Sequence, residues 1–104
     1  MSEFARRRTI MVDTQVRPSD VTKFPIIDAM LSVPREMFVP DALQEASYAG
    51  EHLEVAPGRT LLDPRTFAKI LETVNIQPSD LVLDIGCGFG YSSAVAAHMA
   101  EAVI

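Results

Sequence analysis

The sequence predicts an α/β fold in which several helices precede a strand–loop–helix–strand unit. Residues 81–85 read Leu-Val-Leu-Asp-Ile, a short and nearly continuous apolar run that is typical of a strand buried on both faces of a parallel sheet. A strongly periodic helix precedes this run, and a helix of small residues, from about Tyr91 to Ala100, follows it. Residues 102–104 are apolar and predict the start of a second strand.

The composition indicates one packed domain without a membrane span. The chain has 104 residues, a net charge of -5, 48% hydrophobic residues and one cysteine. This apolar content is too high for a disordered tail, and no apolar run approaches the roughly 18 residues that cross a bilayer. The N-terminus lacks the apolar stretch of a secretory signal, and a single cysteine suits a reducing compartment, so we expect a cytoplasmic protein. The acidic balance argues against a general affinity for nucleic acid.

The first half of the chain predicts helices separated by turns. Residues 4–12 fit a short helix, and we expect its three consecutive arginines, residues 6–8, to form a solvated face. Residues 17–20 (Arg-Pro-Ser-Asp) predict a turn. A second helix is expected to have Thr22 as its cap and to end at Pro34. Its buried stripe would consist of Ile27, Met30 and Leu31.

The middle of the chain predicts extended backbone and then the clearest helix. Residues 52–62 alternate apolar and polar side chains around a Pro-Gly turn. Asp63 then precedes Pro64, which predicts a helix cap followed by proline at the first helical position. A cap is the simpler interpretation of Asp63, with a catalytic acid as the alternative. The expected core stripe of this helix consists of Phe67, Ile70, Leu71 and Val74.

The loop after residues 81–85 is the strongest candidate for a binding site. It reads Asp84-Ile-Gly-Cys-Gly-Phe-Gly-Tyr91 and lies at the carboxyl end of the expected strand, where α/β sheets bind ligands. The glycine spacing fits neither the dinucleotide fingerprint nor the phosphate-binding P-loop. An acidic residue followed by G-x-G-x-G is instead typical of S-adenosylmethionine-dependent methyltransferases. The candidate cofactor-binding residues are therefore Asp84, Gly86, Cys87, Gly88 and Gly90; the alternative is a glycine-rich turn with no ligand.

Other candidate sites are weaker. Cys87 has no histidine near it in sequence, which favours a small space-filling residue over a redox or nucleophilic role. His52 and His98 are far apart and lack partners at ligand spacing, so no metal site is expected. Arg59 either contacts a substrate carboxylate or only borders the crevice, and the sequence does not decide between the two.

Several segments together resemble the protein-L-isoaspartate O-methyltransferase family along nearly the whole chain. They include Met11-Val12, Gln15-Val16, Asp28-Ala29-Met30, Val33-Pro34-Arg35-Glu36-Met37-Phe38-Val39-Pro40, Ala46, Tyr48, Gly58-Arg59-Thr60, Pro64 and the glycine loop. The resemblance implies a Rossmann-like methyltransferase with an N-terminal helical extension, truncated after the first β-α unit. Residues 1–62 would form the helical and extended N-terminal region, and residues 63–104 the start of the S-adenosylmethionine-binding domain.

The resemblance also implies a reaction and its substrates. Enzymes of the family transfer a methyl group from S-adenosylmethionine to the carboxylate of isoaspartyl residues in damaged proteins, as the first step of repair. The substrate would be a protein or peptide, with neither nucleic acid nor membrane as a partner. Thr60 would lie at the catalytic site, close to the substrate.

Two departures from the family pattern keep other interpretations open. The family has a G-Q-T-I-S-Q-P-like segment with an active-site serine, and Leu62 stands at that position here. The alternatives are a methyltransferase with another substrate or a divergent, non-catalytic binding module. In addition, the sequence stops at Ile104, before the acidic residue that would hold the ribose. We therefore expect the 104-residue piece to be inactive alone and to associate with copies of itself or with missing chain.

Overall fold

Helical turns make up most of the first half of the chain, as the sequence predicts. The computed structural model describes residues 2–104. The expected cap at Thr22 is wrong, because the second helix begins after Lys23 and no side chain caps it. Pro25 in its first turn fixes the backbone there and has no N–H to satisfy, which explains how this helix starts without a cap. The helical elements are α1 (Glu3–Met11), η1 (Val12–Val16), η2 (Arg17–Ser19), α2 (Phe24–Ser32), η3 (Arg35–Phe38) and η4 (Asp41–Ala46).

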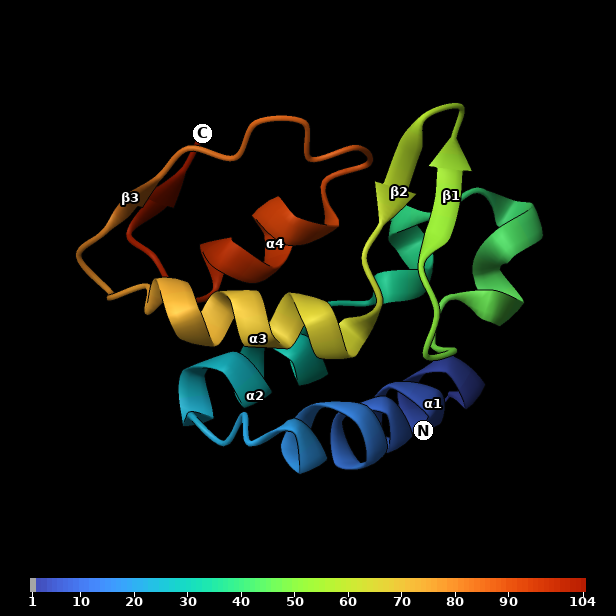
Figure 1. The fold of residues 1–104 in the computed structure, drawn as a ribbon, viewed down its shortest axis with the longest axis horizontal. Coiled ribbons are helices and arrows are strands. Elements are labelled where there is room, and N and C mark those ends of the chain that lie inside the picture. Colours follow the sequence, from blue (N-terminus) through green and yellow to red (C-terminus); the bar gives the residue numbers. More distant parts are fainter. Residues whose placement is uncertain (1) are drawn as a thin grey trace.

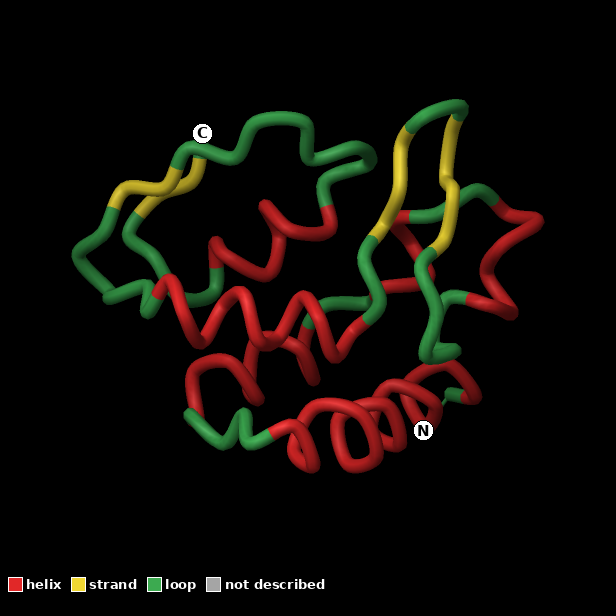
Figure 2. The backbone as a smooth tube through the Cα atoms, in the orientation of Figure 1, coloured by secondary structure: helices red, strands yellow, loops and turns green. Residues whose placement is uncertain are grey.

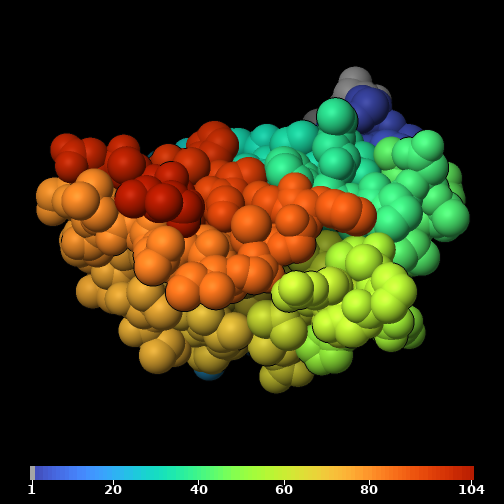
Figure 3. Space-filling view, turned by 90° about the horizontal axis from the view of Figure 1, so that it is seen from above, coloured from blue at the N-terminus to red at the C-terminus, as the bar shows by residue number. Residues whose placement is uncertain are grey.

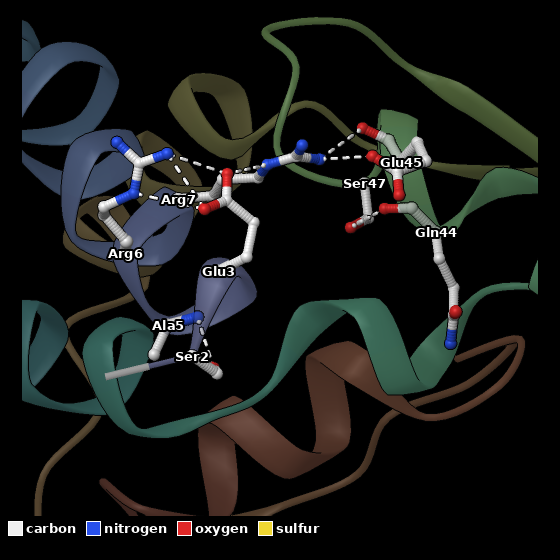
Figure 4. A network of polar contacts seen from close by, with 8 residues as sticks. All are labelled: Ser2, Glu3, Ala5, Arg6, Arg7, Gln44, Glu45 and Ser47. Carbon is white, nitrogen blue, oxygen red and sulfur yellow. Dashed lines mark hydrogen bonds and ion pairs between the residues drawn. The ribbon is translucent and has the colours of Figure 1, made fainter.

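Two of the three arginines of α1 bind other parts of the chain, and the expectation of a solvated face is wrong for Arg8; Arg7 forms its ion pairs at the surface. Arg7 lies between two carboxylates, with its Nη1 2.7 Å from Glu45 of η4 and its Nε 3.1 Å from Glu3 (Figure 4). Arg8 is mostly buried and donates from Nε to the hydroxyl of Tyr48 at 2.9 Å. These bonds attach α1 to the turns that follow α2, whereas Arg6 remains largely in solvent.

A hairpin and a long helix occupy the middle of the chain. Strands β1 (Leu53–Ala56) and β2 (Arg59–Leu61) pair antiparallel, with a bulge between Glu54 and Ala56. The strands are joined by a turn at Gly58, whose φ is 71°. Helix α3 (Pro64–Val74) is capped as predicted, since the Asp63 carboxylate accepts from the Thr66 N–H at 3.1 Å. Burial alone would raise the pKa of Asp63, but the hydrogen bonds from Thr66 outweigh it and lower the pKa.

The buried stripe of α3 differs in part from the expected one. Phe67 and Leu71 are buried as predicted, whereas Ile70 and Val74 are exposed. The residues that complete the buried face are Pro64 and Ala68. Ile70 lines a cavity described below instead of packing into the core.

The strand–loop–helix–strand order is correct, but the expected burial of the first strand is wrong. Strands β3 (Leu81–Val82) and β4 (Ala102–Val103) pair in parallel and are connected through α4 (Tyr91–Ala97), which lies between them in the sequence. The pairing continues to Asp84, whose N–H donates to Ile104 O at 3.0 Å. Leu81, Leu83 and Ile85 are 67–84% exposed, because among residues 2–104 no helix covers the face of the sheet on which they lie.

The core lies between the helices, and the two small sheets stand at opposite ends (Figure 2). Helix α3 crosses the middle of the molecule, with α1 and α2 on one side and α4 on the other (Figure 1). No helix among residues 2–104 combines the length and apolar character that a membrane span requires. The protein is thus a small domain of mixed helices and strands whose core side chains come from Met11, Val12, Val16, Val21, Ile26, Ile27, Ala29, Met30, Val33, Tyr48, Phe67, Ala68, Leu71, Tyr91, Val95 and Met99.

Candidate functional site

The glycine loop runs from Asp84 at the end of β3 to the first residue of α4. Gly86, Gly88 and Gly90 all have positive φ, at 73°, 61° and 97°. Residues with a side chain rarely adopt a positive φ, so the backbone conformation of the turn itself requires the three glycines. A Cβ on Gly88 would meet no atom within 4 Å, so the backbone there is also open to a ligand. Backbone conformation and ligand access are therefore compatible explanations of the same glycines.

The Asp84 carboxylate is fixed beside this loop. Its Oδ2 accepts from the hydroxyls of Ser92 at 2.6 Å and Ser93 at 3.0 Å, both in the first turn of α4. Because both contacts use one oxygen, Oδ1 can accept from an amine or a hydroxyl of a ligand. The half-buried side chain thus presents a negative charge of fixed direction at the carboxyl end of β3.

The β1–β2 hairpin forms the opposite wall of the site. Arg59 and Thr60 lie in β2, opposite Ala56 and Glu54, and both are exposed. Nη1 of Arg59 is 3.7 Å from the position that a Cβ on Gly86 would occupy. In the space-filling view the glycine loop lies against the hairpin (Figure 3). Residues about 25 positions apart in the sequence therefore meet at one crevice.

Two adjoining cavities lie between the hairpin and the loop. The larger has a volume of about 250 Å³ and contains one charged lining residue, Asp84, which we use to name it the Asp84 cavity. The smaller has a volume of about 40 Å³ and contains one charged lining residue, Arg59, so we call it the Arg59 cavity. The residues that line both are Thr60, Leu61, Gly86, Cys87 and Tyr91. The pair of cavities thus has a negative side and a positive side.

The structure brings together most of the residues that the sequence singles out. Four of them line the Asp84 cavity, namely Thr60, Asp84, Gly86 and Cys87. Gly88 lines the Arg59 cavity. Gly90 lines neither; it is the cap residue of α4, and a Cβ there would lie 3.9 Å from the Phe38 ring. Its place behind the loop indicates a packing role.

Neither histidine joins the site, and no metal-binding group is found among residues 2–104. His52 directly precedes β1, and its Nδ1 accepts from the N–H of Asp63, the cap residue of α3, at 3.1 Å. His98 borders a separate cavity of about 620 Å³ between α2, α3 and α4, which contains none of the candidate site residues.

Arg35 contacts two residues that line the Asp84 cavity, Leu62 and Tyr91, and it has no role among the sequence-based predictions. It is fully buried, and its Nη2 donates to Leu62 O at 2.8 Å while its Nε donates to Ser47 O. Its guanidinium carbon is 4.9 Å from the centre of the Tyr91 ring. Burial raises the pKa of the Tyr91 hydroxyl, and Arg35 offsets only part of that rise. One buried cation therefore joins the segment after β2 to the residue after the glycine loop.

A signal for Arg35 is present in the sequence. It is a charged residue between Pro34 and Phe38, in a segment, residues 33–40, that also contains several apolar residues and two prolines. A buried arginine needs acceptors for its N–H groups, and here backbone carbonyls accept from Nε and Nη2, whereas the buried Nη1 has no partner among residues 2–104. Carbonyl acceptors leave no pattern in a sequence, so the partners could be found only in the structure.

Comparisons with known proteins point to one family. The family model described as "Protein-L-isoaspartate(D-aspartate) O-methyltransferase (PCMT)" matches residues 7–104. A protein-L-isoaspartate O-methyltransferase of Methylorubrum extorquens is 41% identical over 95 residues, which is 91% of this chain and 42% of the relative. Relatives of the same name from Herpetosiphon aurantiacus and Koribacter versatilis are 36% and 35% identical, over 95% and 99% of this chain and 44% and 46% of their own. The chain therefore spans less than half the length of these relatives.

Proposed function

The chain belongs to the protein-L-isoaspartate O-methyltransferase family, and from this membership we propose that the complete gene product transfers a methyl group to the free carboxylate of isoaspartyl residues. The observation that carries the proposal is the meeting of Thr60, Asp84, Gly86 and Cys87 at one cavity beside the hairpin. The substrate is a damaged protein or peptide. In this proposal neither nucleic acid nor a membrane is a partner.

The donor in this proposal is S-adenosylmethionine, held on the Asp84 side of the crevice. Two features of the residues fit it: the open backbone at Gly88 and the available Oδ1 of Asp84, which suits the amine or a hydroxyl of the donor. Gly86 and Cys87 would line the same cavity, and Gly90 would keep the loop packed on Phe38. The parallel pairing of β3 and β4 around α4 supports a Rossmann-like donor domain beginning near residue 63, after an N-terminal region of residues 1–62.

Methyl transfer to a carboxylate requires little acid–base catalysis by the protein. When bound, the donor supplies an electrophilic methyl group: a carboxylate oxygen forms the new C–O bond, the electron pair of the broken S–C bond remains on sulfur, and no proton moves. The acceptor is already ionised at pH 7, so no strong base is needed. Thr60 borders both cavities and would contact the acceptor at their junction. The contribution of the chain is then to align the two reactants and to exclude water.

Leu62 favours a second candidate function. Its side chain lines the Asp84 cavity at the position where the family pattern has an active-site serine. An apolar side chain there removes a hydrogen-bonding group from the acceptor site. The second candidate is therefore a relative with another acceptor, or a binding module that no longer transfers methyl groups.

A methyl-transfer assay tests the proposal and separates it from the second candidate. The complete gene product is incubated with methyl-labelled donor and an isoaspartyl peptide, with the aspartyl form of the same peptide as control. We expect base-labile label, as in a methyl ester, only on the isoaspartyl peptide. Transfer only after Leu62→Ser would indicate a damaged acceptor site. The absence of transfer by both forms, with the donor still bound, would favour the binding module.

A further inference from the structure

Within residues 2–104 Arg59 has no partner, unlike Arg35, the other arginine beside the site; Arg65 is also unpaired but borders a different cavity. Among residues 2–104, no hydrogen bond or ion pair engages its guanidinium, which is exposed at the edge of β2. The arginines that bind carboxylates or carbonyls of the chain are Arg6, Arg7, Arg8, Arg17 and Arg35. Arg59 therefore has all its donors available while its Nη1 lies close to Gly86.

The two cavities share five lining residues, but the one charged residue that lines each of them has the opposite sign. Asp84 is the one charged residue that lines the larger cavity, and Arg59 is the one charged residue that lines the smaller. The proposed reactants also have opposite charges, since the donor is a sulfonium cation and the acceptor is a carboxylate. Each reactant therefore has one cavity that attracts it. Thr60 and Gly86, which border both cavities, mark the place where the two would meet.

The rest of the chain makes a positive charge at this place significant. The net charge of these 104 residues is -5, so this part of the protein repels an anionic acceptor. The other residues that line the Arg59 cavity are uncharged, and several are apolar, including Phe38, Leu61 and Phe89. A guanidinium can hold a carboxylate through two parallel N–H···O bonds, which fixes its orientation as well as its position.

We propose that Arg59 is a specificity-determining residue that binds the carboxylate of the methyl acceptor and selects anionic acceptors over neutral ones. In this role it supplies the polar contact that Leu62 cannot make. The proposal rests on the proposed function, because that function provides the carboxylate. It extends that function by assigning the recognition of the acceptor to β2 of the hairpin.

The test measures charge selection directly. The complete gene product is titrated with two peptides that differ at one group: an isoaspartyl residue with a free carboxylate, and the same residue with that carboxyl as an amide. Binding is measured in the presence of the demethylated donor, so that no transfer occurs. The variants are Arg59→Gln and Arg59→Lys. Arg65→Gln is the matched control, because Arg65 is also an exposed arginine but borders a different cavity.

We expect the wild type to prefer the acid over the amide by about tenfold, which is the effect of a charged hydrogen bond at a partly exposed site. Arg59→Gln should abolish this preference, Arg59→Lys should retain part of it, and Arg65→Gln should retain all of it. The affinity for the demethylated donor should be the same in all four proteins. In the transfer assay, Arg59→Gln should raise KM for the isoaspartyl peptide by a similar factor and change kcat less.

Two results would overturn the assignment: a wild type that binds acid and amide equally, or an Arg59→Gln variant that still prefers the acid. Failure of the proposed function gives a different pattern. In that case the wild type transfers no methyl group, although the preference for the acid and its dependence on Arg59 are still measured by binding.

Discussion

The helical core and the segment from β3 through the glycine loop both contain many apolar residues but bury them very differently. In the core, Val16, Val21 and Met30 are fully buried. Along residues 81–89, Leu83 and Ile85 are 67% and 84% exposed, and Phe89 is 54% exposed. Apolar patterning therefore predicts which side chains seek burial, whereas burial itself depends on which elements come to lie against them.

The difference follows from how each region is connected. Helix α2 packs against α1 and η1, and α3 packs against η1 and α2, so these helices cover one another's apolar side chains. Among residues 2–104, strand β3 pairs with β4 alone, over a few residues, and α4 covers one face of this pair. In the described part of the chain, the other face presents its apolar side chains to solvent. Contiguous exposed apolar surface is a common site of association.

The largest predicted effect concerns Arg35, which joins the core to the site. Arg35→Ala would leave the carbonyls of Ser47 and Leu62 without their donor and open a void beside Tyr91. We expect a loss of about 3–5 kcal/mol in the free energy of unfolding. Arg65→Ala, at an exposed arginine of α3, should change it by less than about 0.5 kcal/mol. Chemical denaturation of the two variants measures both values, and equal losses would contradict the assigned role of Arg35.

Substitution of one leucine in each region compares the two regions more directly. Leu71 is 4% exposed in α3, and Leu83 is 67% exposed after β3. Leu71→Ala should cost about 2–4 kcal/mol, whereas Leu83→Ala should cost less than about 0.5 kcal/mol. If the 104-residue chain associates with itself through the exposed face, Leu83→Asp should shift its sedimentation toward the monomer. An unchanged sedimentation profile together with a large loss of stability for Leu83→Ala would mean that this leucine is buried.

The sequence predicts the elements better than their burial. Helix α3, its cap and the order of β3, α4 and β4 are local features, set by Asp63, Pro64 and the glycine spacing, and all are confirmed. The burial of Ile70 and of residues 81–85 depends on neighbours that periodicity does not specify, and these predictions are wrong.

The candidate site shows the same division. The glycine loop and Thr60 are visible in the sequence, and the structure places them at one crevice. The burial of Arg35 and the position of Arg59 beside Gly86 arise from contacts between distant segments. Such contacts follow from the packing of the hairpin against the loop, which no single segment of the sequence determines.

A smaller effect than those at Arg35 and Leu71 is predicted at Asp63, which lies where the hairpin and α3 meet. Asp63→Ala removes the cap of α3 and should cost about 1 kcal/mol at pH 7. The folded pKa of Asp63 is lowered, so its ionised form adds stability above the unfolded value near 4. That contribution is lost as the pH falls through the folded pKa. Asp63→Asn keeps an acceptor for Thr66 without the charge and should cost less than alanine at pH 7. The wild type and Asp63→Asn should therefore converge in stability as the pH falls below about 4, as measured by thermal unfolding. A constant difference over this range would show that the charge of Asp63 does not contribute to the cap.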